Sequence, residues 1–218
     1  MKKFELTTEF ITNFLGTKLF RIKALVEFGK VEKGELGGFV EKEENLDHDG
    51  DAWVSGNAWV YGDARVSGNA EVSGNAEVSG NAEVYGDARV SGDAEVSGNA
   101  EVYGDARVYG DAEVSGNAEV YGDAWVSGDA EVSGNAWVYG DQMYATVKGF
   151  GSEYRNTTFF ITKDGNVCVN CGCFSGTLEQ FREKVEETHK DTKYAKEYLM
   201  IADLMEMHFK EELEKIKK

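Results

Sequence analysis

The sequence predicts a mainly-β protein, in which a single-stranded parallel β-helix with triangular coils of 18 residues joins a small N-terminal β cap to a C-terminal ββαα domain. Residues 52–141 repeat every six residues, fifteen times, with no insertion, and such a period is typical of a solenoid. The chain contains no proline, which suits a backbone whose N–H groups are nearly all needed in β ladders. Beyond residue 141 the period ends, and signals for a hairpin and two helices follow.

Residues 1–33 are predicted to form strands that cap the N-terminal end of the solenoid. They contain apolar residues spaced as in short strands: Phe4, Leu6, Phe10, Leu19, Phe20 and Ile22. Residues 34–51 are predicted to form a degenerate first coil, because Leu36 stands eighteen residues before Val54 and is in phase with the repeat. The predicted β-helix therefore covers residues 34–141.

Each repeat has the pattern Ala-x-Val-(Ser/Tyr)-Gly-(Asn/Asp), from Ala52 to Asp141. Ala and Val alternate with polar positions, as the inward residues of a short strand do. Gly and Asn or Asp most easily adopt the left-handed backbone of a sharp corner. Hairpins would need longer arms and would not keep a constant phase. Three strand-and-corner units instead close one coil, so residues 52–141 form five regular coils that rise about 4.8 Å each.

This pattern, an aliphatic residue at every sixth position with a small residue two places before it, resembles the hexapeptide-repeat left-handed parallel β-helix family. The resemblance covers about 90 of the 218 residues. It implies the left-handed winding of that family, whereas β crossovers in general favour the right hand. Each coil of such a solenoid buries its face only against its neighbours, so both ends need caps.

The C-terminal domain, residues 142–218, is predicted to begin with a hairpin. Segments 157–162 and 166–171 flank Asp164-Gly165, a dipeptide that strongly favours a two-residue turn. The six-residue period has ended by this point, so the hairpin belongs to a different structure from the coils.

Two helices are predicted after the hairpin. Thr177 is a suitable N-cap for a helix that continues to about His189. A second helix, over residues 191–214, has its apolar residues on one stripe: Tyr194, Tyr198, Ile201, Leu204, Met205 and His208. A purely capping role needs less structure than this, so the domain is also a candidate binding element.

The chain is strongly acidic. Lys and Arg number 23 against 40 Asp and Glu, which gives a formal net charge of −17. This argues against direct binding to nucleic acid or to an anionic membrane, because both need clustered positive charge. Residues 52–141 hold sixteen acids and three arginines and so supply −13 of the total. Three interpretations stay open: a basic protein partner, bound cations, or high solubility alone.

The cysteines and the N-terminus favour a reducing compartment. Cys168, Cys171 and Cys173 are odd in number and close together, unlike a secreted disulfide framework. The chain reaches Glu5 before any apolar run develops, and no segment is long enough to span a membrane. We therefore expect a cytoplasmic protein with ordinary thiols, since a tetrahedral zinc site takes four ligands.

Because every third repeat stacks on the same side, the outward residues fall into columns. One side carries tyrosines between two columns of carboxylates, and this is the candidate binding face: Glu83, Tyr85, Asp87, Glu101, Tyr103, Asp105, Glu119, Tyr121, Asp123, Tyr139 and Asp141. A neighbouring side carries a second acidic face: Glu77, Glu95, Glu113 and Glu131. The four tryptophans occupy only the first two and last three repeats, so we expect them to pack against the caps.

Like charges stacked one coil apart repel, and three explanations for the acidic columns remain. In the first, the repeat was duplicated and its surface serves only solubility. In the second, the acidic surface docks on a basic partner, as nucleic-acid mimics do. In the third, stacked Asp oxygens bind cations. The sequence lacks the nonapeptide calcium pattern. Carboxylates about 4.8 Å apart also differ in spacing from phosphates at about 3.4 Å per strand.

Two enzyme classes dominate the hexapeptide family, and the chain lacks the residues of both. The resemblance implies a histidine base for the acyltransferases and three zinc-bound histidines for the carbonic anhydrases. The only histidines are His48, His189 and His208, all outside residues 52–141. No phosphate-binding or dinucleotide-binding glycine pattern is present. We therefore expect a protein that is not an enzyme, with no catalytic residue, metal site or cofactor.

Segments outside the repeat resemble a group of largely uncharacterised hexapeptide-repeat proteins from phages and prophages of gut bacteria. The segments are Leu19–Leu25, Gly34–Val40, Lys148–Phe160 and Cys171–Phe174. Small acidic phage proteins without catalytic machinery often inhibit host defence by binding it. By analogy, the resemblance implies a phage or mobile-element protein that acts in the host-cell cytoplasm.

The sequence therefore favours a non-catalytic protein-binding module that inhibits a host defence protein through an acidic, nucleic-acid-mimic-like surface. The expected partner is a protein with a basic surface, such as a nucleic-acid-binding host protein; direct contact with nucleic acid or membrane is not expected. Two alternatives stay open. One is a structural β-helix protein that self-assembles through a coil face into a homo-oligomer, as trimeric hexapeptide proteins do, and the other is an acyltransferase-like hexapeptide enzyme.

Overall fold

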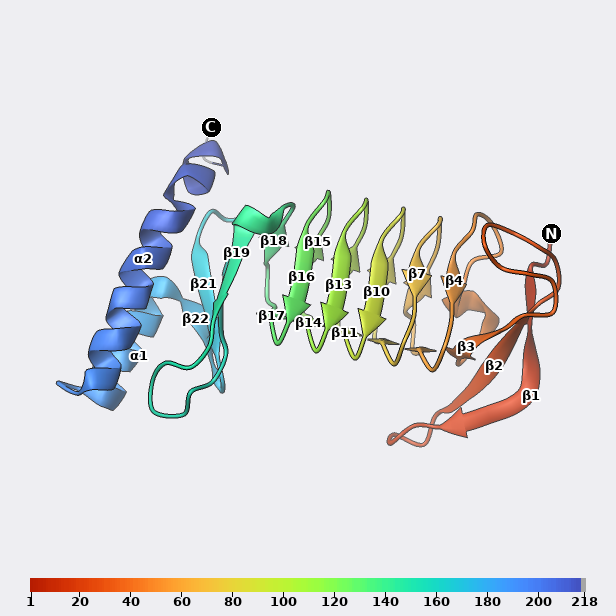
Figure 1. The fold of residues 1–218 in the computed structure, drawn as a ribbon, viewed down its shortest axis with the longest axis horizontal. Coiled ribbons are helices and arrows are strands. Elements are labelled where there is room, and N and C mark those ends of the chain that lie inside the picture. The colour runs from red at the N-terminus through yellow and green to blue at the C-terminus, as the bar shows by residue number, and fades with distance from the viewer. Residues whose placement is uncertain (217–218) are drawn as a thin grey trace.

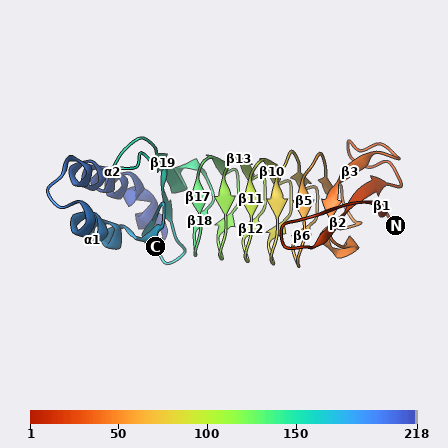
Figure 2. The ribbon, with the colours of Figure 1, turned by 90° about the horizontal axis from the view of Figure 1, so that it is seen from below.

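The computed structural model of the chain describes residues 1–216. A group of N-terminal strands, a parallel β-solenoid of about six turns, and a small antiparallel sheet with two helices follow one another along the long axis (Figure 1). The first strands lie at one end of the molecule, and α1 and α2 lie at the other (Figure 2). The predicted mainly-β fold is confirmed, whereas the left-handed winding stays a prediction.

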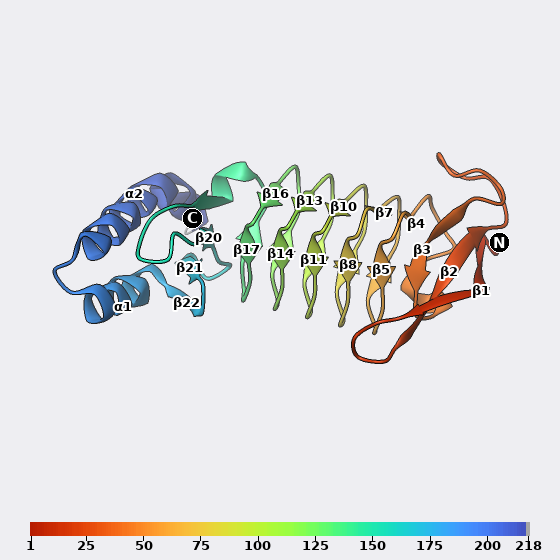
Figure 3. The same ribbon diagram turned by 60° about the horizontal axis from the view of Figure 1, so that its bottom comes forward.

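The fifteen two- to four-residue strands of the solenoid form three parallel ladders, one for each side of the coil. The first face consists of β4 (Trp53–Val54), β7 (Glu71–Val72), β10 (Arg89–Gly92), β13 (Arg107–Gly110) and β16 (Trp125–Gly128). The second face consists of β5 (Trp59–Val60), β8 (Glu77–Val78), β11 (Glu95–Val96), β14 (Glu113–Val114) and β17 (Glu131–Val132). The third face consists of β6 (Arg65–Val66), β9 (Glu83–Val84), β12 (Glu101–Val102), β15 (Glu119–Val120) and β18 (Trp137–Val138). Figure 3 shows the first and second faces side by side.

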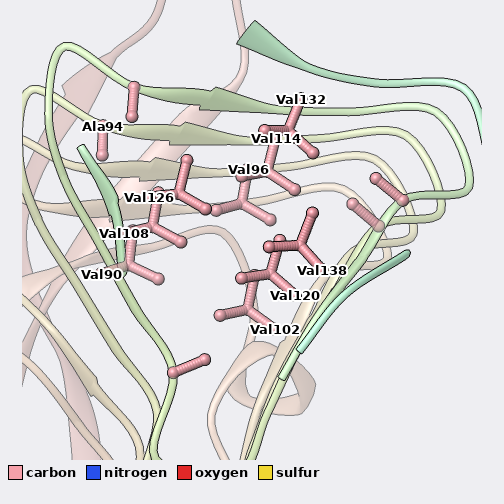
Figure 4. Packing of buried hydrophobic residues seen from close by; sticks show 14 of the residues in the cluster. Val90, Ala94, Val96, Val102, Val108, Val114, Val120, Val126, Val132 and Val138 are labelled. Carbon is pink, nitrogen blue, oxygen red and sulfur yellow. The ribbon is translucent and has the colours of Figure 1, made fainter. Parts of the chain in front are cut away.

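Valine and alanine side chains fill the interior, and the valines of successive coils lie in rows (Figure 4). All of them between Ala52 and Val138 are fully buried. Residues in the strands of one regular coil pair with the residues eighteen positions later in the next coil, as Val102 does with Val120. At the corners, neighbouring backbones nearly touch: a Cβ on Gly98, whose φ is 71°, would lie 2.9 Å from the backbone N of Gly116. The corner therefore requires glycine both for its φ and for the space.

Three antiparallel strands, β1 (Phe4–Thr12), β2 (Lys18–Ala24) and β3 (Leu36–Val40), extend the sheet of the second face. β3 pairs in parallel with β5 and places Val40 beside Val60, an offset of twenty residues. The predicted phase of eighteen is wrong here, because Leu36 is about half exposed and pairs with Lys23 of β2. The first coil is irregular, as expected, and contains the 3-10 helix η1 (Glu43–Asn45).

Polar side chains close the N-terminal end of the solenoid. Many carbonyl groups of each coil accept from N–H groups of the preceding coil, so the corresponding carbonyls at this end need other donors. Lys3 Nζ donates to the carbonyl O of Ala52 at 2.9 Å. Asn45 Nδ2 donates to the carbonyl O of Gly62 at 3.1 Å and to that of Ala64 at 2.8 Å. Both side chains are buried, and burial lowers the pKa of Lys3.

The C-terminal domain is a four-stranded antiparallel sheet followed by two helices. Its elements, in chain order and sheet order, are β19 (Tyr144–Val147), β20 (Thr157–Ile161), β21 (Val167–Cys171) and β22 (Phe174–Thr177), then α1 (Leu178–His189) and α2 (Lys193–Ile216). The predicted hairpin is β20–β21, and the predicted N-cap Thr177 accepts a hydrogen bond from Gln180 N. The ββαα expectation omitted β19 and β22, which flank that hairpin on either side.

The C-terminal sheet closes the other end of the solenoid, to which it is joined by the 3-10 helix η2 (Asp141–Met143). Side chains of the cap pair with both kinds of backbone group in the last coil, and Asn170 Nδ2 donates to the carbonyl O of Glu131 at 2.9 Å. Thr158 Oγ1 lies 2.9 Å from Glu131 N, and Asp141 Oδ1 lies 2.9 Å from Trp125 N. Buried side chains of β20 and of both helices belong to the same apolar cluster as the solenoid valines. No helix within residues 1–216 is long and apolar enough to cross a membrane.

Candidate binding face

The four predicted tyrosines stand in one column beside the strands of the third face. Tyr85 and Tyr103 have ring centroids 4.9 Å apart and planes 2° apart, and Tyr103 and Tyr121 have the same separation with planes 7° apart. Their strands pair in register, so identical side chains repeat at the coil spacing. The last ring, Tyr139, is tilted by 49° to Tyr121 and lies edge-on to Trp137.

A column of glutamates lies beside the tyrosines. Glu83, Glu101 and Glu119 are paired in register on β9, β12 and β15. Tyr85 Oη donates to Glu101 Oε2 at 2.9 Å, one coil further on. At the C-terminal end, Lys163 forms an ion pair with Glu119. The structure therefore brings the predicted tyrosines and glutamates together as one surface.

The tyrosine hydroxyls hold their protons well above neutral pH. Burial raises the pKa of Tyr85, and the hydrogen bond to Glu101 adds to the shift. Burial, with smaller contributions from neighbouring tyrosines and Glu119, raises the pKa of Tyr121 to about 12. Burial likewise raises the pKa values of Tyr103 and Tyr139. The column thus presents neutral aromatic rings between charged carboxylates.

The residues at the coil corners behave differently on the two acidic sides. At the corner after the second face, Asn81 donates to Asn99 at 2.9 Å and Asn99 to Asn117 at 3.0 Å, so amides form a ladder along the axis. At the corner after the third face, carboxylates take the place of these amides. Within residues 1–216, the side chains of Asp105 and Asp123 form no hydrogen bond or ion pair. The sequence shows asparagine at one corner and aspartate at the other, but the hydrogen-bonded amide ladder was not predicted from it.

Two of the predicted aspartates have structural partners. Asp87 Oδ1 accepts from Asn69 Nδ2 at 2.9 Å. Asp141 belongs to the C-terminal cap through its contact with Trp125 N. Asp87 is exposed like Asp105 and Asp123, although one of its oxygens accepts from Asn69. Together with the tyrosines of the third face, we name these three carboxylates the tyrosine–aspartate ladder: Tyr85, Tyr103, Tyr121, Tyr139, Asp87, Asp105 and Asp123.

The second acidic face also forms a continuous column. Glu77, Glu95, Glu113 and Glu131 are paired in register from β8 to β17. Burial raises the pKa of Glu95, and the charges of Glu77 and Glu113 raise it further. Burial and Glu113 raise the pKa of Glu131. This face carries no tyrosine column, because its corresponding positions are serine except at Tyr61.

A hollow of about 520 Å³ lies where the third face meets the irregular first coil. The carboxylates that line it outnumber its cationic groups: Glu43, Glu44, Asp47 and Glu83 against Arg65 and His48. The acidic surface of the third face therefore continues to the N-terminal end of the solenoid.

The tryptophans and the cysteines lie outside the tyrosine–aspartate ladder. Trp53 is buried against Phe28 of the N-terminal region, as expected, whereas Trp125 is 44% exposed and lies under the guanidinium of Arg107. The three cysteines are free thiols. Among residues 1–216, no group of three or more His, Cys, Asp or Glu side chains is arranged to hold a metal ion.

Neither the protein-family models nor the curated proteins contain a match to this chain.

Proposed function

We propose that the tyrosine–aspartate ladder binds a protein with a basic surface, and that the chain is a non-catalytic inhibitor of phage or mobile-element type whose partner is a nucleic-acid-binding host protein in the host-cell cytoplasm. One observation carries the proposal. The third face combines stacked tyrosines with a corner at which Asp87, Asp105 and Asp123 form no hydrogen bond with one another, and neither other face has both.

Arginine and lysine are the side chains that this surface fits. A guanidinium group donates two parallel hydrogen bonds to a carboxylate, and its flat apolar surface can lie along the edges of the stacked rings. The ladder offers a carboxylate and a ring edge in every coil from Tyr85 to Asp123, with the rings 4.9 Å apart. Ion pairs worth about 0.2–1 kcal/mol each at exposed sites add up along such a surface.

The spacing also says what kind of mimicry the face can offer. Rings and carboxylates repeat at the coil height, about 4.8 Å, whereas phosphates on one nucleic-acid strand repeat at about 3.4 Å. A partner would therefore recognise the density of negative charge instead of a copied phosphate geometry. Strong negative fields steer basic partners and accelerate their association.

The two alternatives receive less support. Self-assembly through a coil face is opposed by the carboxylate columns of the second and third faces, which repel a second copy of this acidic chain. The resemblance implies that an acyltransferase of this fold needs a histidine on the coils, and none of the three histidines lies in the regular coils, residues 52–141.

A retention experiment tests the proposal. The immobilised full-length chain is exposed to host lysate in its wild-type form and as the triple variant Asp87→Asn, Asp105→Asn, Asp123→Asn. We expect the wild type to retain one basic protein in a stoichiometric amount and the triple variant to retain at least tenfold less, because three charge-assisted contacts are lost.

The matched control is Glu77→Gln, Glu95→Gln, Glu113→Gln, which removes the same charge from the second face. It should retain the partner as the wild type does. Equal losses in the two variants would show that net charge alone acts, and retention of nothing above background by the wild type would contradict the proposal outright.

A further inference from the structure

A second hollow, of about 250 Å³, lies within the C-terminal domain. It is enclosed by α1, the turn between β21 and β22, the loop before β20, and Tyr198 of α2. The ladder reaches α2 through Tyr139, whose hydroxyl donates to Glu212 at 3.1 Å. Tyr198 is fourteen residues from Glu212, about 21 Å along the helix. The hollow is therefore separate from the proposed partner surface.

Aromatic rings make up its inner wall. Phe181 and Phe174 have ring centroids 5.6 Å apart, and Phe181 and Tyr198 have centroids 5.5 Å apart in an edge-to-face arrangement. Phe181, Val185 and Tyr198 are buried. Such a wall favours a flat apolar group, which gains both burial and edge-to-face contacts.

The rim of this hollow is cationic in a chain that is otherwise strongly acidic. Arg155 and Lys184 line it beside His189, and Glu153 is the one carboxylate among its described lining residues. Glu153 lies 3.9 Å from the Arg155 guanidinium, and Lys184 Nζ donates to Glu187 at 2.7 Å. All four side chains are more than half exposed, so both pairs are weak. In the hollows along the solenoid, by contrast, carboxylates outnumber cations.

The backbone around the hollow is shaped by close contacts. A Cβ on Gly151 would lie 2.0 Å from Tyr198 Oη, and one on Gly172 would lie 2.6 Å from Arg155 Nη1. Both glycines have positive φ, and so does Tyr154, at 54°, where a non-glycine residue is strained. The loop before β20 is thus held against Tyr198. Arg155 is held against the turn between β21 and β22, and these contacts give the rim a fixed shape.

We propose that this hollow binds a small anionic molecule with a flat apolar body, of which an aryl carboxylate is the simplest form. The body lies on the wall of Phe174, Phe181 and Tyr198, and the anionic group meets Arg155 and Lys184. Charge-assisted hydrogen bonds to these two side chains orient the ligand. The volume, just below the range of about 300–1,000 Å³ for drug-sized ligands, limits the ligand to a single ring with a short substituent.

The test uses phenylacetate as the probe and the full-length chain, with two measurements. Amide chemical shifts in NMR spectra should report saturable, millimolar binding at Gly172, Cys173 and Thr188. The exposed thiol of Cys173 lines the same hollow, so saturating phenylacetate should slow its alkylation by iodoacetamide at least threefold. Acetate lacks the apolar body and 2-phenylethylamine has the opposite charge, and neither should bind at these concentrations.

Two variants and one matched control complete the test. Thr188→Trp places a large ring in the hollow from an exposed position of α1, and it should abolish binding. Lys184→Glu should raise the Kd for phenylacetate by about tenfold or more, because it replaces attraction of the carboxylate with repulsion. Lys196→Glu makes the same charge change on α2 outside the hollow, and it should leave the Kd within twofold of the wild type.

The proposal is overturned if 2-phenylethylamine shifts the same amides as strongly as phenylacetate does, or if Lys184→Glu and Lys196→Glu weaken binding equally. Should Thr188→Trp fail to fold, the two charge variants on exposed helix positions still decide the outcome. The triple aspartate variant of the third face should bind phenylacetate as the wild type does, so failure of this proposal is separable from failure of the partner proposal.

Discussion

At each coil corner the chain places either an amide, which both donates and accepts hydrogen bonds, or a carboxylate, which only accepts. Asn99 accepts from Asn81 and donates to Asn117, so its side chain joins three coils. Asp105 occupies the equivalent place after the third face, between Asp87 and Asp123, and cannot extend a ladder. The corner after the third face therefore lacks the amide-to-amide hydrogen bonds that stabilise the corner after the second face.

We expect Asp105→Asn to stabilise the protein by about 0.5–1 kcal/mol, since its new amide can donate to Asp123 and one repulsion on each side disappears. Urea unfolding followed by circular dichroism measures the change. The reverse exchange, Asn99→Asp, should destabilise by a similar amount because the donation to Asn117 is lost. If both variants are as stable as the wild type, the corner side chains contribute nothing to stability along the axis.

The tyrosine column makes stability depend on pH at the alkaline end. Burial raises the pKa of Tyr121 from its ordinary value of about 10 to about 12, so folding favours the protonated phenol. Its contribution is complete below about pH 10 and is lost as the pH rises through about 12. Absorbance at 295 nm should show a late ionisation step that Tyr121→Phe reduces by one phenol, and a loss of amplitude near pH 10 instead would contradict the described burial.

At this scale the sequence predicted much of the site, and the reason is the period. A constant repeat assigns every outward residue to a column, so the partners of Tyr103 could be named without coordinates. The tilt of Tyr139 could not be predicted, because it depends on Trp137 and on a contact with α2 that the repeat does not specify.

At the scale of elements, both caps supply hydrogen-bond partners for backbone groups that the end coils leave unpaired. At the N-terminal end, Asn45 donates to carbonyl groups and Glu41 accepts from a backbone N–H. At the C-terminal end, Thr158 accepts from Glu131 N and Asn170 donates to Glu131 O. Each cap needs both kinds of side chain, because the edge of a parallel ladder presents N–H and C=O groups alike. It is the solenoid counterpart of the capping that helix ends require.

We expect Asn45→Leu to destabilise the protein by about 1–3 kcal/mol, because it leaves the carbonyls of Gly62 and Ala64 buried without a donor. The control is Asn57→Ala, which removes one 3.3 Å hydrogen bond at an exposed corner and should change stability by about 0.5 kcal/mol or less. Thermal unfolding of the two variants side by side decides the matter. Equal effects would show that the capping amide is dispensable.

The elements that the sequence did not predict all lie outside the repeat. Leu36 matched the period by distance along the chain, but two extra residues between Leu46 and Trp53 lengthen the first coil and place Val40, twenty residues before Val60, in the stacked position. β19 and β22 are four residues each and pair on the two sides of the central hairpin. Short strands of this kind are defined by their neighbours and leave little pattern of their own.

At the scale of the whole molecule, both ends of the solenoid are covered while its three faces are open (Figures 1 and 3). An uncovered end would present a row of unpaired backbone groups, as an edge strand does, and such edges promote aggregation. The architecture therefore restricts contacts with other molecules to the sides of the solenoid and to the C-terminal domain.

We expect the purified chain to be a monomer, with a light-scattering mass close to 24.0 kDa across a wide range of concentration. Net charge of −17 adds repulsion between copies, which low ionic strength strengthens. A stable dimer or a concentration-dependent polymer would contradict this and would support the self-assembly alternative.

Each cap contacts the coil next to it, and the coils between the caps share one geometry. Eighteen residues can therefore be inserted or deleted inside the repeat without disturbing either cap. Each such change alters the length of the ladder by about 4.8 Å, while its width and charge pattern stay the same. Duplication or loss of a single DNA segment would then adjust the reach of the surface to partners of different size, in discrete increments, with no redesign of the core.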